Sequence, residues 1–140
     1  MKKKKIISVI LLVTWCLFIF IMSSFNDNYS NSQSDFVINI VSDFLDIRNV
    51  SNISFIIRKL AHFSEYFILV LLAINCFKNY KIKSYYIYSI IFSILYSCTD
   101  EFHQLFISGR SGQLIDIGID TIGIITGALM YFIIKNKTKS

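Results

Sequence analysis

Long runs of apolar residues alternate with short polar segments along the chain. Helices are predicted over four of these runs, at residues 6–22, 53–77, 85–107 and 113–134. The first run is slightly shorter, and the other three are longer, than the roughly 20 residues that an α-helix needs to cross the hydrocarbon core of a bilayer. We therefore expect an all-α fold, an integral membrane four-helix bundle that forms a single domain over residues 1–140.

The distribution of charge predicts the orientation of these helices. Ten of the fourteen basic residues fall in three short stretches, at residues 2–5, 78–83 and 135–139, and none of the nine acidic residues does. The cytoplasmic ends of membrane helices are enriched in Lys and Arg. We therefore expect a multi-pass plasma-membrane protein with both termini in the cytoplasm. This segregation also argues against nucleic-acid binding, despite a net charge of +5.

The composition agrees with a membrane location. Hydrophobic residues make up 54% of the chain, above the roughly 45–50% that is typical of soluble domains. The three cysteines, Cys16, Cys76 and Cys98, lie in apolar runs and form no C-x-x-C pair. We interpret them as small core residues, and expect neither a disulfide framework nor a cysteine zinc site.

Two segments before the second run need separate interpretation. Residues 6–22 follow a basic patch, as in a signal peptide, but Ser23, Ser24 and Phe25 do not form a small-residue cleavage site, so we expect an uncleaved helix. Residues 23–52 are polar, and apolar positions from 36 to 45 recur at helical spacing after Ser34, which can cap a helix. We predict a short amphipathic helix in this first outer loop, on the membrane surface or over the mouth of the bundle.

Ionisable and polar residues enter three of the four predicted spans at a similar depth. A central Asp, Lys or Arg costs about 2.5–3.5 kcal/mol, so such residues usually face the protein interior and mark function. At about 1.5 Å per residue, they lie on the order of 5–14 Å below the outer ends of their helices. They are His62 and Glu65 in the second span, Asp100 and Gln104 in the third, and Asp116 and Asp120 in the fourth.

Helical spacing places the polar residues of each span on one face. The sets that share a face are Arg58, His62 and Glu65; Lys59, His62 and Tyr66; Asp100 and Gln104; and Asp116 and Asp120. We therefore expect one outward-facing charged pocket in which basic and acidic groups nearly balance. The basic groups are Arg58, Lys59 and Arg110, and the acidic groups are Glu65, Asp100, Glu101, Asp116 and Asp120.

Two sequence blocks around these residues resemble the VanZ-like family of bacterial membrane proteins. Residues 58–67 read R-K-L-A-H-F-S-E-Y-F and are similar to the family's K-x-x-H-F-x-x-Y. Residues 100–127 are similar to D-E-x-x-Q-x-F, G-R, D-x-x-x-D and G-x-x-x-G, in that order. Ile107 and Ser108 depart from the pattern, because many members have a proline before the glycine. The family's marked positions fall on Lys59, His62, Phe63, Tyr66, Asp100, Glu101, Gln104, Phe106, Gly109, Arg110, Asp116 and Asp120.

The resemblance implies a role in the bacterial cell envelope. The family takes its name from a protein associated with low-level resistance to the glycopeptide teicoplanin, and the resemblance implies no particular reaction. We expect the pocket to bind a lipid-linked wall precursor, an anionic lipid or a glycopeptide, with basic groups holding phosphate or carboxylate. The expected ligand-binding residues are Arg58, Lys59, Glu65, Tyr66, Gln104, Arg110, Asp116 and Asp120.

Other interpretations remain open at this point. An enzyme acting on a lipid-linked substrate would use His62 as general acid or base, with Asp100, Glu101 or Asp116 as the catalytic partner that orients it or activates water. A metal site would begin with His62 and Glu65 at i, i+3, but a single histidine among scattered acids more often forms a hydrogen-bonded network, so we expect no metal and no cofactor.

A purely structural role and a transport role complete the alternatives. An ion-pair network can simply fix helix register. Transport is disfavoured because no polar chain continues toward the cytoplasmic side through residues 69–74 or 87–95. In the fourth span, Gly123 and Gly127 form a G-x-x-x-G that predicts close packing against another helix. The oligomeric state is not predicted.

Overall fold

Helices make up nearly all of the described part of the chain. The computed structural model describes residues 2–25, 50–107 and 113–137, and of residues 50–55 the backbone alone. The helices are α1 (Lys2–Ser24), α3 (Val50–Asn79), α4 (Tyr85–Gln104) and α5 (Leu114–Lys137). Each predicted span coincides with one of these helices, which confirms the all-α prediction. The predicted amphipathic helix and Arg110 lie outside the described residues.

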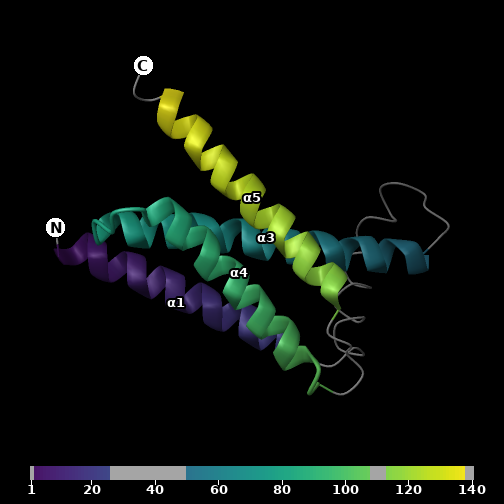
Figure 1. Ribbon diagram of the computed structural model, residues 1–140. Coiled ribbons are helices and arrows are strands. Elements are labelled where there is room, and N and C mark those ends of the chain that lie inside the picture. Colours follow the sequence, from purple (N-terminus) through teal and green to yellow (C-terminus); the bar gives the residue numbers. More distant parts are fainter. Residues whose placement is uncertain (1, 26–49, 108–112, 138–140) are drawn as a thin grey trace.

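Helix α3 is the centre of the bundle. It contacts α1, α4 and α5, and its contact with α5 is the most extensive. Helices α1 and α5 each contact α4 as well but do not contact one another along their described lengths. Figure 1 shows the start of α1 and the α3–α4 turn at one end, while α5 crosses α3 and leads away from it toward the C-terminus.

Three helices are long and apolar enough to cross a membrane. These are Lys2–Ser24, Ile56–Asn79 and Leu114–Lys137. The chain is therefore a multi-pass membrane protein whose helices lie in a lipid bilayer. Helix α4 is not among the three, so a fourth span and the predicted orientation stay predictions. Large apolar side chains such as Ile6, Ile10 and Leu17 are more than half exposed on α1, as expected of a helix that faces lipid.

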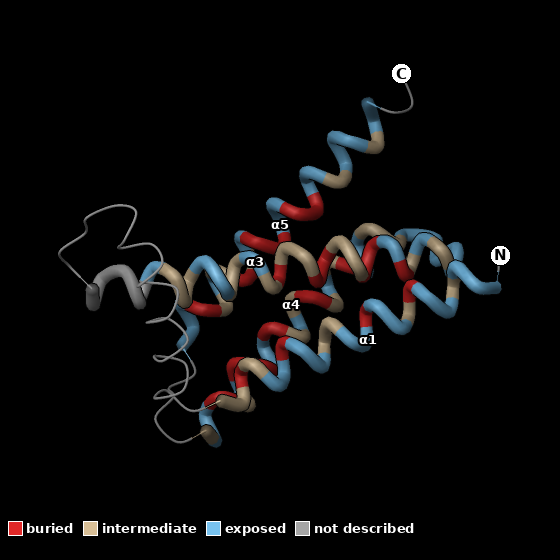
Figure 2. Tube along the Cα trace, turned by 180° about the vertical axis from the view of Figure 1, so that it is seen from behind, coloured by how far each residue is buried: buried red, intermediate tan, exposed pale blue. Residues whose placement is uncertain are grey.

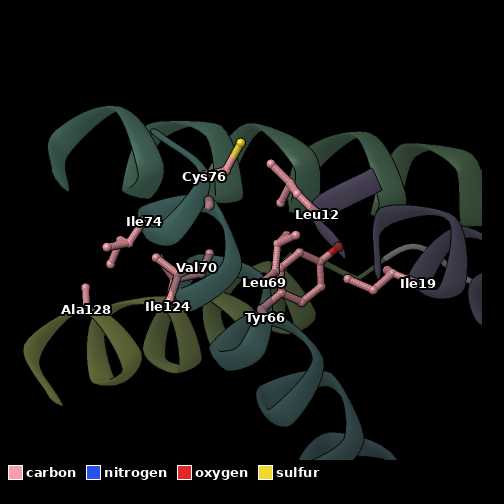
Figure 3. Close-up of a cluster of buried hydrophobic side chains, with 10 residues drawn as sticks. Leu12, Ile19, Tyr66, Leu69, Val70, Ile74, Cys76, Ile124 and Ala128 are labelled. Carbon is pink, nitrogen blue, oxygen red and sulfur yellow. The ribbon is translucent and has the colours of Figure 1, made fainter. Parts of the chain in front are cut away.

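The hydrophobic core lies where α1 and α5 pack onto α3. Figure 2 shows that buried residues recur along the helices on their inward sides, whereas the C-terminal part of α5 has none. Figure 3 shows the core itself, in which side chains from three helices meet around Tyr66 and Leu69. Its buried members are Leu12, Ile19, Tyr66, Leu69, Val70, Ala73, Ile74, Cys76, Ile124 and Ala128.

Two glycines of α5 allow its close approach to α3. A Cβ atom built on Gly123 would lie 2.5 Å from the carbonyl oxygen of Phe63. At Gly127 it would lie 2.8 Å from a methyl group of Val70 and 2.9 Å from the carbonyl oxygen of Phe67. Only a residue without a side chain fits against backbone at such distances. The predicted G-x-x-x-G packing is confirmed.

The α3–α4 turn reverses the chain within a few residues. Lys81 has a φ angle of 58°, in the left-handed region. Its amide donates to the carbonyl of Lys78 at 3.0 Å, and the amide of Ile82 donates to the carbonyl of Phe77 at 3.1 Å. This is the Schellman pattern that ends a helix, formed here with lysine where glycine is usual. Helix α4 therefore runs back beside α3, and its C-terminal end lies beside the N-terminal half of α3.

Candidate functional site

Polar side chains from α3, α4 and α5 gather at the end of the bundle opposite the α3–α4 turn. Because α4 runs antiparallel to both neighbours, its last turns lie beside early turns of α3 and α5. Asp120 is fully buried and Glu101 is 3% exposed. We call this group the polar cluster; its members are Lys59, His62, Ser97, Asp100, Glu101, Gln104, Asp116 and Asp120.

Two contacts between polar side chains join α3 to α5 inside the polar cluster. The ammonium group of Lys59 donates a hydrogen bond to Oδ1 of Asp116, and both side chains are largely buried. One turn further along each helix, Nδ1 of His62 lies 3.4 Å from Oδ1 of Asp120. The two aspartates at i, i+4 therefore face Lys59 and His62, which are at i, i+3 on the facing helix, since both spacings place residues on one helix face.

Asp120 is also held from the third helix. The hydroxyl of Ser97 on α4 donates to Oδ2 of Asp120 at 2.6 Å. The two carboxylate oxygens of Asp120 thus face different helices, one toward His62 and one toward Ser97. The contact between His62 and Asp120 is a close approach and not a hydrogen bond, because Nδ1 of His62 and Oδ1 of Asp120 are both buried without a hydrogen-bond partner among the described residues.

Asp100 and Glu101 are satisfied only in part. Oδ2 of Asp100 accepts a hydrogen bond of 3.4 Å from Nε2 of Gln104, and Oε2 of Glu101 accepts one of 2.9 Å from the backbone amide of Gln113. The other oxygen of each carboxylate is buried without a hydrogen-bond partner among the described residues. Neither acid has a basic partner within that part of the chain. Buried polar atoms of this kind are rare in folded proteins and call for an additional donor or a cation.

One group within the polar cluster has the arrangement of a metal site. His62, Glu101 and Asp116 each offer a ligand atom, and these atoms lie within 4.8 Å of one another. The sequence predicted a possible site that begins with His62 and Glu65 and is completed by other carboxylates; the group in the structure keeps His62 and does not include Glu65. Convergence of α4 and α5 on α3 supplies different carboxylates to His62.

The remaining predicted site residues lie at the edge of the polar cluster, in the core, or outside the described residues. Arg58 and Glu65 are half-buried on α3, and the backbone carbonyl of Glu65 accepts a hydrogen bond of 3.0 Å from Nε1 of Trp15 on α1. Tyr66 is fully buried in the hydrophobic core beside Leu69 (Figure 3). A ligand role for these three residues stays a prediction, as it does for Arg110.

Comparison with known proteins gives one match. Residues 8–135 match the family described as VanZ/LLP1. The chain belongs to the VanZ/LLP1 family. No curated protein and no solved structure matches it. The resemblance stated on the two sequence blocks is therefore confirmed over nearly the whole chain, and the protein is a VanZ-like membrane protein.

Family motifs alone did not indicate how the acids of this VanZ-like chain pair. Sequence reasoning named Asp100, Glu101 or Asp116 as the partner of His62; donor atoms of Glu101 and Asp116 lie within 4.8 Å of one on His62, and Asp120, which it did not name for this role, lies 3.4 Å from Nδ1. It also missed Ser97 entirely. A signal for Ser97 existed, because Ser89, Ser93 and Ser97 follow one another at i, i+4 along the face of α4 that leads to Asp100 and Glu101.

This line of serines corrects one expectation. Ser89, Ser93 and Ser97 are all fully buried, so polar side chains do continue along α4 away from the polar cluster. The hydroxyls of Ser89 and Ser93 donate to carbonyls of their own helix, at 2.7 and 2.9 Å. They therefore satisfy themselves locally and form no continuous relay with the acids.

Proposed function

We propose that this VanZ-like protein binds a ligand of the bacterial cell envelope at the polar cluster and is linked in this way to resistance against glycopeptides of the teicoplanin type. The observation that carries the proposal is the set of buried carboxylate oxygens on Asp100 and Glu101 that lack a hydrogen-bond partner among the described residues. An ion-pair network with a purely structural role would be expected to satisfy its own members. These two carboxylates instead have capacity for a group that comes from outside the chain.

The arrangement favours a ligand that carries hydrogen-bond donors. The one lysine of the polar cluster is already bonded to Asp116, which neutralises it. Amine or hydroxyl groups of a ligand would bind to Asp100 and Glu101, and a phosphate or carboxylate would bind to Arg58 or Arg110. Lipid-linked wall precursors, anionic lipids and glycopeptides all combine groups of these kinds with an apolar part that the bilayer can hold.

Drug susceptibility of whole cells tests this function. Strains with the gene deleted or overexpressed are compared across a panel of glycopeptides, and overexpression is expected to raise the inhibitory concentration of teicoplanin. Asp100→Asn and Arg110→Ala are expected to abolish the effect while the protein still accumulates in the membrane. Thr99→Val is the matched control, because Thr99 is exposed and its hydroxyl bonds only to the carbonyl of Tyr96 in its own helix.

Two results would contradict the proposal. Unchanged susceptibility on overexpression would remove the link to glycopeptides. Loss of accumulation in the Asp100→Asn and Arg110→Ala variants would favour the structural interpretation, in which the cluster only joins the helices. An immunoblot of the membrane fraction separates loss of the protein from loss of its function.

A second candidate is an enzyme, and the contact between His62 and Asp120 favours it. A histidine oriented by a buried carboxylate is a common general acid or base. Ser97 would not be the nucleophile in this arrangement, because its hydroxyl donates to Asp120 and not to His62. Comparison of envelope lipids and wall precursors in cells with and without the gene tests this candidate, and identical profiles would count against it.

A further inference from the structure

We propose that His62, Glu101 and Asp116 bind a divalent metal ion, and that Zn²⁺ fits the site best. One donor atom of each residue lies within 4.8 Å of a donor atom of the other two. The three residues come from α3, α4 and α5, so only the folded bundle brings them together. Residues far apart in sequence that converge in this way form the usual kind of preorganised metal site.

The size of the triangle suits a single ion. A point equidistant from three atoms that are 4.8 Å apart lies about 2.8 Å from each of them, and bonds from Zn²⁺ to nitrogen or oxygen measure about 2.0–2.2 Å. No two of these donor atoms are more than 4.8 Å apart. Movements of the donor atoms by less than about 1 Å therefore bring all three into bonding range. Asp116 accepts from Lys59 through Oδ1, and a carboxylate can bind a cation through its second oxygen at the same time.

The surroundings of His62 match those of a metal-binding histidine. Such histidines almost always donate their second ring N–H to a carboxylate or carbonyl, which fixes the tautomer and the ring orientation. Nδ1 of His62 lies 3.4 Å from Oδ1 of Asp120 without forming a hydrogen bond, and a small rotation that makes this bond would leave Nε2 for the ion. Ser97 holds Asp120 from the far side at 2.6 Å and completes this support.

Glu101 gives an independent indication of a cation. The residue is 3% exposed, its Oε2 accepts from the amide of Gln113, and its Oε1 has no partner among the described residues. An ionised oxygen left in this state is costly in an apolar interior, and a bound cation removes that cost. No described basic residue pairs with Glu101 to do so.

The ligand set selects among metals. One imidazole and two carboxylates suit Zn²⁺, which accepts nitrogen and oxygen and leaves a fourth position open when three protein ligands bind it. Mg²⁺ prefers six oxygen ligands and retains most of its water. The open position would give a phosphate or carboxylate of an envelope ligand a binding point among the acids, a role that rests on the proposed function.

Zinc binding to the purified full-length chain in detergent tests the inference. The protein is stripped with a chelator, dialysed against ZnCl₂ and analysed for metal content and affinity. We expect about one Zn²⁺ per wild-type chain, and at least a tenfold loss of affinity in Glu101→Gln and His62→Gln. His103→Gln is the matched control, since His103 is the other histidine of the chain, lies outside the triangle, and should leave binding unchanged.

X-ray absorption at the zinc edge keeps the test decisive if a variant fails to fold, which circular dichroism would reveal. A first shell of one imidazole with oxygen ligands in the wild type supports the site, and sulfur in that shell overturns it because cysteine would then be the ligand. Absence of stoichiometric zinc, or an equal loss in His103→Gln, also overturns it. The two proposals can fail separately. If the wild-type protein binds no zinc but variants of the polar cluster still alter glycopeptide susceptibility, the metal inference is wrong and the proposed function stands.

Discussion

His62 on α3 and Asp120 on α5 lie on either side of the most extensive interface between the described helices, with 3.4 Å between Nδ1 and Oδ1. Asp120 has no exposed surface, and His62 is only half-buried at the edge of the same layer. The contact lies one turn before Gly123, where α5 meets the backbone of α3. Close helix packing and the placement of the acid are therefore consequences of the same crossing.

Removal of the Ser97 hydroxyl should weaken this arrangement. Ser97→Ala takes away the donor to Oδ2 of a fully buried carboxylate, and we expect a loss of about 1.5–3 kcal/mol in the free energy of unfolding. Ser93→Ala is the matched control, because its hydroxyl bonds only to the carbonyl of Ser89 in its own helix. Unfolding in mixed micelles measures the free energy of unfolding of both variants. Equal losses in the two would show that the hydrogen bond to Asp120 contributes nothing specific.

The contact between Lys59 and Asp116 should behave as a buried ion pair. Lys59→Met leaves the carboxylate of Asp116 without its cation, and we expect destabilisation on the order of 3 kcal/mol. The double variant Lys59→Met with Asp116→Leu should recover part of this loss, since no unpaired charge remains. Lys83→Met, an exposed lysine of the α3–α4 turn, is expected to change the free energy of unfolding by less than about 0.5 kcal/mol. Additive single and double effects would contradict the pairing.

Gly123, in the G-x-x-x-G of α5, and Gly118, which lies outside that pattern, should respond differently to alanine. Gly123→Ala places a methyl group against the carbonyl of Phe63, and overpacking of this kind costs about 1–3 kcal/mol. Gly118 has nothing within 4 Å of its built Cβ, so Gly118→Ala should be neutral or stabilising by up to about 1 kcal/mol through helix propensity. The midpoint of thermal unfolding in detergent ranks the two, and a reversed order would exclude close packing at Gly123.

Sequence patterns were sufficient to predict the helices and the layer in which their polar residues meet. Apolar runs gave the approximate positions of all four described helices, because burial in lipid demands uninterrupted hydrophobic length. The depth of each residue along its helix predicted that His62, Asp100 and Asp116 lie in one layer, because the rise per residue of an α-helix is fixed. Each of these predictions needs only the sequence of a single helix.

Pairing within the layer could not be predicted, because it depends on how neighbouring helices are rotated and crossed. Asp100, Glu101, Asp116 and Asp120 all lie within reach of His62 by depth alone. The glycines of α5 select a crossing that brings Asp120 to His62 and Asp116 to Lys59. Tyr66 shares a helix face with the polar residues, yet that face turns into the core where α1 covers it (Figure 3).

The outward position of the polar cluster is the central claim, and thiol labelling in intact cells tests it most directly. The chain is first freed of Cys16, Cys76 and Cys98. Cysteine is then placed at Leu114, which is 86% exposed at the start of α5, or at Lys83 in the α3–α4 turn.

A membrane-impermeant maleimide should label Leu114→Cys in intact cells, and should label Lys83→Cys only after the cells are permeabilised. The opposite pattern would place the polar cluster on the cytoplasmic side and contradict a site for envelope ligands.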